Sequence, residues 1–298
     1  MEKISLAFLG TSDSIPTKTR NHSAILLSYK NENILIDCGE GTQRQFKLLG
    51  KSPTTLTRIL LTHWHGDHIL GIPGLFQTLG MLGYSKTIKI YGPNGTKNKI
   101  ELIKKLVNVE IPIETQEVEN KIFVNESDFC LETKLMVHST PSNAYSFIIK
   151  DKRRLDKNKL KKFKLPNSPL LKDLKKGKDI IYKNKKIKAS EVSYIEKGKK
   201  ITVILDTKIN ENAIELAKNS DILVIESSFS SEDKDKAEKF KHLTASDAAT
   251  IAKKAKVKSL ILTHISQRYE RDLLKIEKEA KKIFKTTKIA KDFDSLDI

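Results

Sequence analysis

Four potential metal ligands lie within six positions of the chain: His63, His65, Asp67 and His68. Imidazole nitrogens and carboxylate oxygens are the donors that borderline cations such as Zn²⁺ prefer. An apolar run at 59–62 precedes them. The pattern therefore predicts a loop that leaves a strand and curls around one or two ions, with Gly66 allowing a tight bend and His68 beginning the next helix. The alternative, a polar loop with accidental histidines, fits poorly because the 298 residues include only seven histidines.

Three further candidate ligands each follow an apolar segment of the kind that forms a buried strand: His138, Asp206 and His264. Binding sites in open sheets lie beyond strand ends, so we expect these side chains to meet the first cluster there. The segment LILTH, which ends at His264, repeats the earlier ILLTH and suggests two similar halves that face each other. His22 falls outside this scheme. Asp37, also at a strand end, is expected either to brace the ligand loop or to form a turn.

The rest of the sequence predicts the elements that position these residues. Strands are expected at 4–9, 23–28, 33–37, 59–62, 87–91, 114–118, 128–137, 144–150, 201–205, 221–226 and 259–263. Helices are expected at 42–49, 69–84 (one or two), 97–107, 212–218, 244–255 with Thr244 as N-cap, and 271–284. Hairpins come first and strands mixed with helices follow, which predicts a mixed sheet with helices on its outer faces.

Positive charge is concentrated in one segment. The chain has a formal net charge of +18, and residues 151–200 hold 19 basic and 6 acidic residues. A surplus of this size favours a polyanion such as nucleic acid, whereas a general lysine bias would be spread evenly. We expect residues 151–200 to form an inserted arm for phosphates, and residues 1–150 with 201–298 to form a single domain. The alternative for the segment is a solvated, partly disordered loop.

The cellular compartment is inferred from the cysteines and the termini. Cys38 and Cys130 form no CxxC pair and no disulfide framework, so both are expected to be small buried side chains in a reducing compartment. No apolar run reaches membrane-spanning length, and the N-terminus, acidic at Glu2, is unlike a signal peptide. A cytoplasmic protein with no membrane partner is expected.

Taken together, the motifs resemble the ribonuclease Z (RNase Z) family of the metallo-β-lactamase superfamily, endonucleases that trim the 3′ trailer of precursor tRNA. HWHGDH matches the superfamily signature HxHxDH. The narrower matches are DCGEGTQ, LDT, PTKTRN at 16–21, HLTASDAA at 242–249, THISQRY at 263–269 and the basic insert before Asp206. The resemblance covers nearly the whole chain. Other residues stand where glycine is common in the family: Ser168, Lys172, Leu205 and Ala144.

The resemblance implies an α/β fold of the α+β type, an αββα sandwich with an inserted basic exosite arm and two zinc ions per subunit. By motif position, His63, His65 and His138 would hold the first ion. Asp67, His68 and His264 would hold the second, and Asp206 would bridge the two. The substrate-binding residues would be Lys18, Arg20, Asn21 and Arg268, near the 3′ end of the tRNA. In the family two subunits of a homodimer cooperate, one arm holding the tRNA that the other subunit cuts.

Hydrolysis of a phosphodiester needs a nucleophile, charge neutralisation and a proton for the leaving group. Two zinc ions would supply the first two, and Asp67 would also accept a proton from the attacking water. His242 is the remaining histidine near the site that no metal needs. As the family implies, it would protonate the departing 3′-oxygen with Glu226 orienting it, and the cut would leave a 3′-OH on the tRNA. The alternatives are a helix-start histidine and a strand-end carboxylate.

Two other functions remain open at this point. A small-molecule hydrolase of the same fold, acting on a thioester, lactam or phosphodiester, would use the same ligands but would leave the basic segment without a role. A nucleic-acid-binding module with structural metals would need closed tetrahedral sites, whereas seven ligands for two ions leave open positions.

Overall fold

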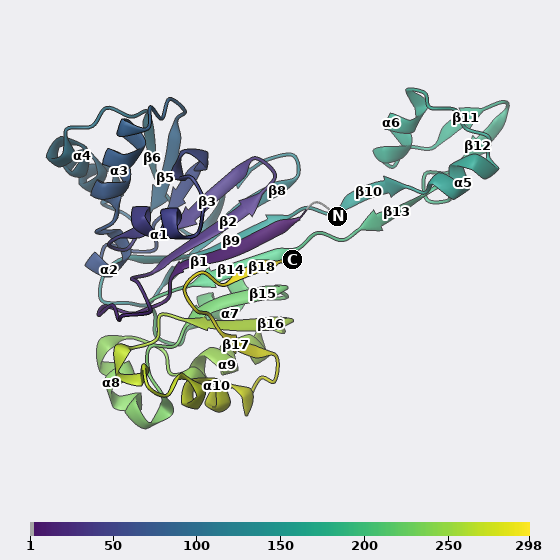
Figure 1. Ribbon diagram of the computed structural model, residues 1–298. Helices are drawn as coiled ribbons and strands as arrows, with labels where there is room; N and C mark the ends of the chain where they lie inside the picture. Colours follow the sequence, from purple (N-terminus) through teal and green to yellow (C-terminus); the bar gives the residue numbers. More distant parts are fainter. Residues whose placement is uncertain (1–2) are drawn as a thin grey trace.

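The computed structural model describes residues 3–298 as two seven-stranded β-sheets that face each other, with helices on both outer sides (Figure 1). Glu2, on which the expectation about a signal peptide rests, lies outside the described residues. The residue pattern predicts one mixed sheet, whereas the structure has two. The αββα sandwich implied by the family resemblance is confirmed.

The first sheet contains the N-terminal half and the last strand of the chain. In order across the sheet, its strands are β18 (Ser295–Asp297), β1 (Ile4–Gly10), β2 (Ala24–Tyr29), β3 (Glu32–Ile36), β4 (Arg58–Leu60), β5 (Ile88–Gly92) and β6 (Ile113–Glu117). Pairing is antiparallel from β18 to β3 and parallel from β3 to β6.

The second sheet repeats this arrangement. Its strands are β17 (Thr287–Ile289), β16 (Ser259–Thr263), β15 (Ile222–Glu226), β14 (Lys200–Ile204), β9 (Ser142–Ile149), β8 (Phe129–Met136) and β7 (Lys121–Asn125). Strands β7, β8, β9 and β14 pair antiparallel, and β14 to β17 pair parallel. The two similar halves suggested by the repeated segments are therefore present.

Helices cover the outer face of each sheet (Figure 1). The first sheet carries α1 (Thr42–Leu48), α2 (Gly66–Ile69), α3 (Ile72–Met81) and α4 (Thr96–Val107). The second carries α7 (Glu211–Ala217), α8 (Lys234–Phe240), α9 (Ala245–Lys254) and α10 (Leu273–Lys281). Single 3₁₀ turns lie at η1 (Pro53–Thr55), η2 (Ser231–Asp233) and η3 (Gln267–Tyr269). Buried aliphatic and aromatic side chains fill the space between the sheets and under each helical layer. No helix of residues 3–298 is long and apolar enough to cross a membrane.

Local sequence explains several element boundaries. Thr244 caps α9 in a capping box, in which its hydroxyl accepts from the N–H of Asp247 at 3.1 Å and the Asp247 carboxylate accepts from the N–H of Thr244 at 3.1 Å. The expected N-cap is therefore confirmed. Helix α2 begins at Gly66, whereas the sequence pattern predicts its start two residues later, at His68. Cys38 and Cys130 are free and buried, as expected.

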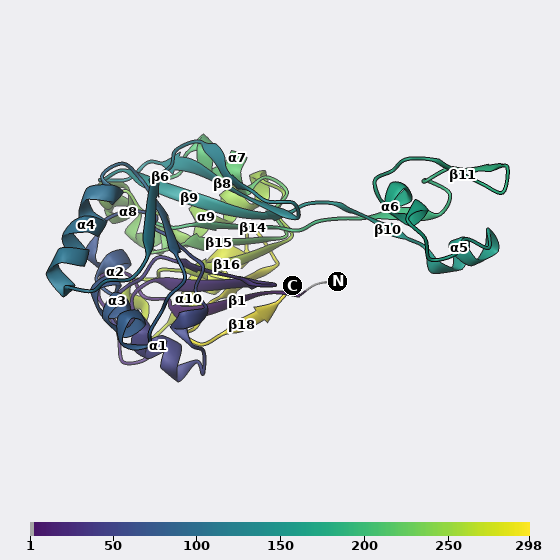
Figure 2. The same cartoon turned by 90° about the horizontal axis from the view of Figure 1, so that it is seen from above.

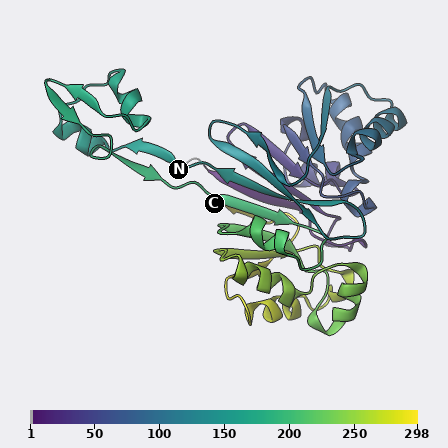
Figure 3. The same ribbon diagram turned by 180° about the vertical axis from the view of Figure 1, so that it is seen from behind.

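The basic arm, residues 151–200, projects far from the sandwich (Figures 1 and 2). Two antiparallel strands form its stalk, β10 (Lys152–Leu155) and β13 (Ser193–Glu196). Its outer part contains α5 (Lys157–Lys162), α6 (Leu170–Lys175), β11 (Ile180–Tyr182) and β12 (Lys185–Ile187). Leu174, Ile187 and Val192 are buried in a small core of its own. Figure 3 shows from behind that only the stalk connects this unit to the two sheets. Short helices, short strands and a small apolar core are therefore present in this segment.

Candidate metal centre and cleft

Strand ends from both sheets bring one group of four donors together: His63, His65, His138 and Asp206, whose donor atoms lie within 4.8 Å of one another. Nδ1 of His65 lies 2.9 Å from Nε2 of His63 and 3.2 Å from Nε2 of His138. Two nitrogens on one tetrahedral zinc ion lie roughly 3.3 Å apart, given Zn–N bonds of about 2.05 Å. These separations therefore fit imidazoles that share a cation.

A second group of donors adjoins the first: Asp67, His68 and His264. Nε2 of His68 lies 3.2 Å from Nε2 of His264, and Oδ2 of Asp67 lies within 3.3 Å of both nitrogens. Asp206 lies between the groups, because its Oδ1 is 3.2 Å from His264 Nε2 and its Oδ2 is 3.5 Å from His63 Nε2. Among the described residues this buried Oδ1 has no hydrogen-bond partner. An unsatisfied buried carboxylate oxygen among imidazoles fits a bound cation.

Asp37 braces one ligand of each group. Its Oδ1 accepts the backbone N–H of Thr62 at 2.7 Å, and its Oδ2 accepts the Thr62 hydroxyl and Nδ1–H of His68, both at 2.6 Å. The Thr62 hydroxyl lies 3.1 Å from Nδ1 of His63. Fixing Nδ1 leaves Nε2 of each ring free for a metal. The expectation that Asp37 braces the ligand loop is confirmed, and its alternative as a simple turn residue is not needed.

Ser228 supplies a matching brace in the other half. Its hydroxyl donates to Oε2 of Glu226 at 2.7 Å and lies 2.9 Å from Nδ1 of His264. His264 and Asp37 both hold a left-handed backbone, with φ of 53° and 56°. Such strain costs about 1–3 kcal/mol per residue and persists where the surroundings enforce it, which is typical of functional sites.

Burial affects the protonation of three of the candidate ligands in the same way. Burial lowers the pKa of His63, His65 and His138 below the ordinary histidine value. These rings are therefore neutral near pH 7, the form in which imidazole binds a metal. Burial alone would raise the pKa of Asp67. The adjacent His68 and His264 outweigh this effect, hold the pKa low and keep the carboxylate ionised.

His242 pairs with Glu226, a carboxylate that belongs to neither donor group. Its Nδ1 lies 3.1 Å from each carboxylate oxygen of Glu226, which is fully buried and also accepts the N–H of Thr207 at 2.7 Å. Burial alone would lower the pKa of His242, but the charges of Glu226 and Asp206, together with the hydrogen bond to Glu226, outweigh it and raise the pKa to about 9. His242 is thus protonated at neutral pH, and it lines the same cleft as members of both donor groups.

The cleft above the two donor groups has a volume of about 470 Å³. Aromatic and basic side chains from the second half border it: Phe229, Phe240, Lys241 and Arg268. The Arg268 guanidinium lies 5.0 Å from the centre of the Phe229 ring and 3.7 Å from Oδ1 of Asp233. The segment 13–15 of the N-terminal loop forms another border. The donor groups are therefore open to a substrate on one side.

The residues expected to meet the substrate occupy different positions. Arg268 lines the cleft, and Lys18 is exposed on the N-terminal loop. Asn21 donates from Nδ2 to the carbonyl oxygen of Glu40 at 2.8 Å. Arg20 departs from the expectation, because it is 4% exposed and its guanidinium is bound to Glu270 and to the carbonyl oxygen of Ile265. In this structure Arg20 holds the loop through these contacts.

Three residues that shape the donor groups or the cleft were not identified from the sequence: Ser228, Phe240 and Glu270. Ser228 lies two residues after Glu226, and Glu270 directly follows the THISQRY segment. Proximity to a motif is therefore the signal that would have found two of them.

Comparisons with known proteins agree with this geometry. A family model described as the anti-Pycsar protein Apyc1 matches residues 4–190. A ribonuclease Z of Nanoarchaeum equitans is 41% identical over 271 residues, which cover 90% of this chain and 85% of that protein. The crystal structure of human tRNase Z, short form, is 25% identical, with a TM-score of 0.71 over 98% of each chain.

The metallo-β-lactamase fold protein YhfI of Bacillus subtilis, at 19% identity, shares the fold with a TM-score of 0.72 over all of both chains. Fold, motif positions and full-length similarity thus lead to the same assignment. The chain belongs to the ribonuclease Z family of metallo-β-lactamase fold enzymes.

Proposed function

We propose that this enzyme is a zinc-dependent endoribonuclease that removes the 3′ trailer from precursor tRNA and leaves a 3′-OH on the tRNA. The observation that carries the proposal is the shared cleft, in which two donor groups joined by Asp206 lie beside a protonated His242. The similarity to proteins named ribonuclease Z and tRNase Z supports the choice of tRNA as substrate.

Two zinc ions per chain fit the donors. His63, His65 and His138 would hold one ion, Asp67, His68 and His264 would hold the other, and Asp206 would contact both. When bound, such a pair lowers the pKa of water and neutralises charge on the phosphate. The mixed nitrogen and oxygen donors suit zinc, and the side of the donor groups that faces the cleft leaves room for substrate.

The protein's own groups would move the protons. Ionised Asp67 lies at the cleft and would accept a proton from the attacking water. Protonated His242 would give its proton to the departing 3′-oxygen of the tRNA, which becomes the 3′-OH, while the phosphate remains on the trailer. Glu226 would hold the His242 ring and keep it charged through its contact at Nδ1.

The basic arm would hold the tRNA at a distance from the cut. Its projection from the sandwich lets it reach a part of the tRNA far from the 3′ end, which we take to be the elbow (Figure 1). Its lysine and arginine side chains would contact phosphates, which positions RNA without reading its sequence. We also propose that 151–200 is an inserted unit, and that 1–150 with 201–298 form one domain.

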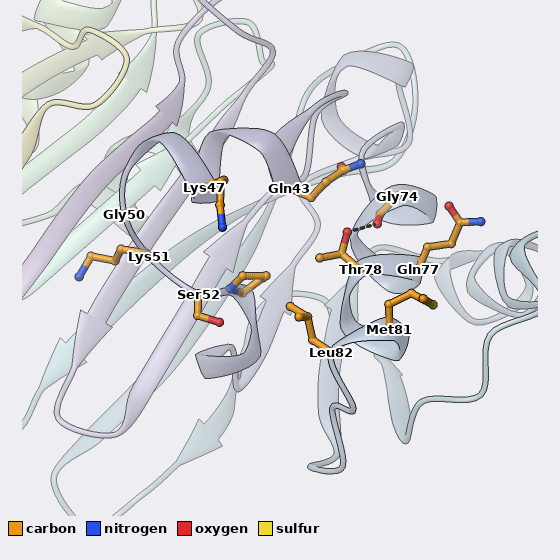
Figure 4. Close-up of a pocket in the computed structure, with 11 residues that line it drawn as sticks. Gln43, Lys47, Gly50, Lys51, Ser52, Gly74, Gln77, Thr78, Met81 and Leu82 are labelled. Atoms are coloured by element: carbon orange, nitrogen blue, oxygen red, sulfur yellow. Dashed lines mark hydrogen bonds between the residues drawn. The ribbon is translucent and has the colours of Figure 1, made fainter.

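A homodimer would let the arm of one subunit hold the tRNA that the other subunit cuts. We propose the face made by α1 and α3 as its interface. A hollow of about 750 Å³ lies there, bordered by Lys47, Met81 and Leu82 (Figure 4). Met81 is 88% exposed and Leu82 is 56% exposed, and clustered exposed apolar side chains mark protein contact surfaces. Light scattering should give a dimer for the wild type and a monomer for Met81→Asp.

Cleavage of an end-labelled precursor tRNA tests the function directly. Mapping of both product ends should place a 3′-OH on the tRNA and a 5′-phosphate on the trailer. Products with a 2′,3′-cyclic phosphate would contradict the proposed chemistry. A cytoplasmic location, proposed because the free cysteines Cys38 and Cys130 suit a reducing compartment, is tested separately by fractionation.

A further inference from the structure

The loop from Ser12 to Asn21 forms part of the cleft wall, and its two ends are tied together. Its segment 13–15 borders the cleft. The N–H of Ser12 donates to the carbonyl oxygen of Asn21 at 2.9 Å, and the N–H of Asn21 donates to Oδ2 of Asp292 at 2.7 Å. These contacts fix the base of the loop. They do not fix the middle of the loop, which carries the exposed Lys18.

Glu270 gathers three side chains of this loop on one carboxylate. Its Oε1 accepts the hydroxyls of Thr17 at 2.9 Å and Thr19 at 2.6 Å, and its Oε2 accepts Nε–H of Arg20 at 2.7 Å. Glu270 directly follows η3, whose Gln267 and Arg268 also border the cleft. One side chain thus connects two separate segments of the cleft wall.

Arg20 makes this connection strong. It is almost fully buried, and its Nη1 donates to the carbonyl oxygen of Ile265 at 2.6 Å, directly after the candidate ligand His264. A buried guanidinium is stable only while its counter-charge is present, and loss of the partner leaves an uncompensated charge. Removal of the Glu270 carboxylate should therefore expel Arg20 and release the loop.

We propose that Glu270 is a positioning residue that sets the shape of the cleft for the single-stranded 3′ end of the RNA substrate. Glu270 touches neither the donor groups nor His242; it acts through the loop and through Arg20. The inference rests on the proposed function, because only a long substrate would extend from the donor groups to the loop. A small aryl phosphodiester, which needs only the donor groups, should not sense the loop.

Steady-state kinetics on both substrates test the proposal. Glu270→Ala should raise KM for precursor tRNA about tenfold with kcat nearly unchanged, because the scissile bond is still cut once the RNA is placed. Glu270→Gln keeps an oxygen for Thr17 and Thr19 but loses the charge that faces Arg20, so its KM should be intermediate. Hydrolysis of the aryl phosphodiester should equal that of the wild type. The matched control is Glu277→Ala, which removes a carboxylate that pairs with Lys281 on α10.

Limited trypsin digestion gives a readout that needs no substrate. Trypsin should cut Glu270→Ala after Lys18 or Arg20 much faster than it cuts the wild type or Glu277→Ala, because the released loop becomes accessible. Equal digestion of all three proteins would overturn the proposal. Equal losses on both substrates would also overturn it, since they would indicate damage to the donor groups. A wild-type protein that hydrolyses the aryl phosphodiester but leaves precursor tRNA intact would instead refute the proposed function, and digestion would still decide whether Glu270 holds the loop.

Discussion

Oδ2 of Asp37 lies 2.6 Å from Nδ1 of His68, and the same carboxylate reaches His63 through the hydroxyl of Thr62. One buried acid thus orients a ligand of each donor group. Glu226, Ser228 and His264 form a second chain of carboxylate, hydroxyl and imidazole in the other half. These partners set the ring tautomers before any cation arrives.

Replacement of Asp37 should weaken metal binding at both donor groups. Asp37→Ala removes the acceptor for Nδ1–H of His68 and for the Thr62 hydroxyl, so the affinity for zinc should fall by about 10–100-fold. Competition with a chromophoric chelator measures this affinity. Asp297→Asn, at an exposed pair with Lys3, serves as the control. Unchanged zinc affinity in Asp37→Ala would contradict the role of this brace.

Asp67→Ala should abolish turnover on precursor tRNA, with a loss of at least about 10³-fold, because it removes a candidate metal ligand and the proposed proton acceptor together. The fold should persist, because the side chain lies at the cleft and contributes nothing to the apolar core. Single-turnover cleavage and circular dichroism give the two measurements. Full activity in a folded Asp67→Ala protein would exclude the mechanism.

The Glu226–His242 pair predicts a specific pH profile. Because the pKa of His242 is raised to about 9, its acid form is present below pH 9 and is lost as pH rises through that value. The rate of cleavage should therefore fall on the alkaline side near pH 9. In Glu226→Gln the larger of the two charges that raise this pKa is gone and that of Asp206 remains, so the alkaline fall should move towards the ordinary histidine pKa of about 6.5. The test is a profile of kcat against pH for the wild type and Glu226→Gln. If kcat falls at the same alkaline pH in both proteins, His242 is not the acid.

Removal of the arm should impair cleavage of precursor tRNA but not phosphodiester hydrolysis at the donor groups. Strands β9 and β14 pair antiparallel where the arm leaves the sandwich, so a short glycine linker can replace residues 152–196. Cleavage of precursor tRNA should fall by at least about 10²-fold, since most phosphate contacts would be lost. Hydrolysis of a small aryl phosphodiester should remain. Intact tRNA cleavage by the shortened protein would favour the small-molecule hydrolase as the alternative and remove the assigned role of the arm.

Much of the fold was predictable because the central strands are continuous apolar runs that end at a potential ligand. This pattern located β4, β14 and β16 together with His63, Asp206 and His264. The short edge strands were not predictable. β18 has only three residues, and it exists because β1 offers unpaired backbone groups. Helix α8 buries only Ala237, so it lacks the apolar periodicity that predicts a helix.

The orientation of Arg20 was beyond sequence reasoning for a different reason. A loop arginine in a basic protein is expected to face solvent or substrate, and its true partner Glu270 lies 250 positions away in the chain. The apolar core of the arm was missed similarly. Its leucines are spaced irregularly, and only the turn of the chain at the tip brings Leu174, Ile187 and Val192 together.

The candidate ligands come from both sheets, with His63 after β4 and His264 after β16. During synthesis, the first half therefore leaves the ribosome with an incomplete set of donors. A nascent chain cannot act as a nuclease on RNA nearby until β16 has been translated and has joined its sheet. Division of the centre between two halves thus delays enzymatic activity until folding is nearly finished.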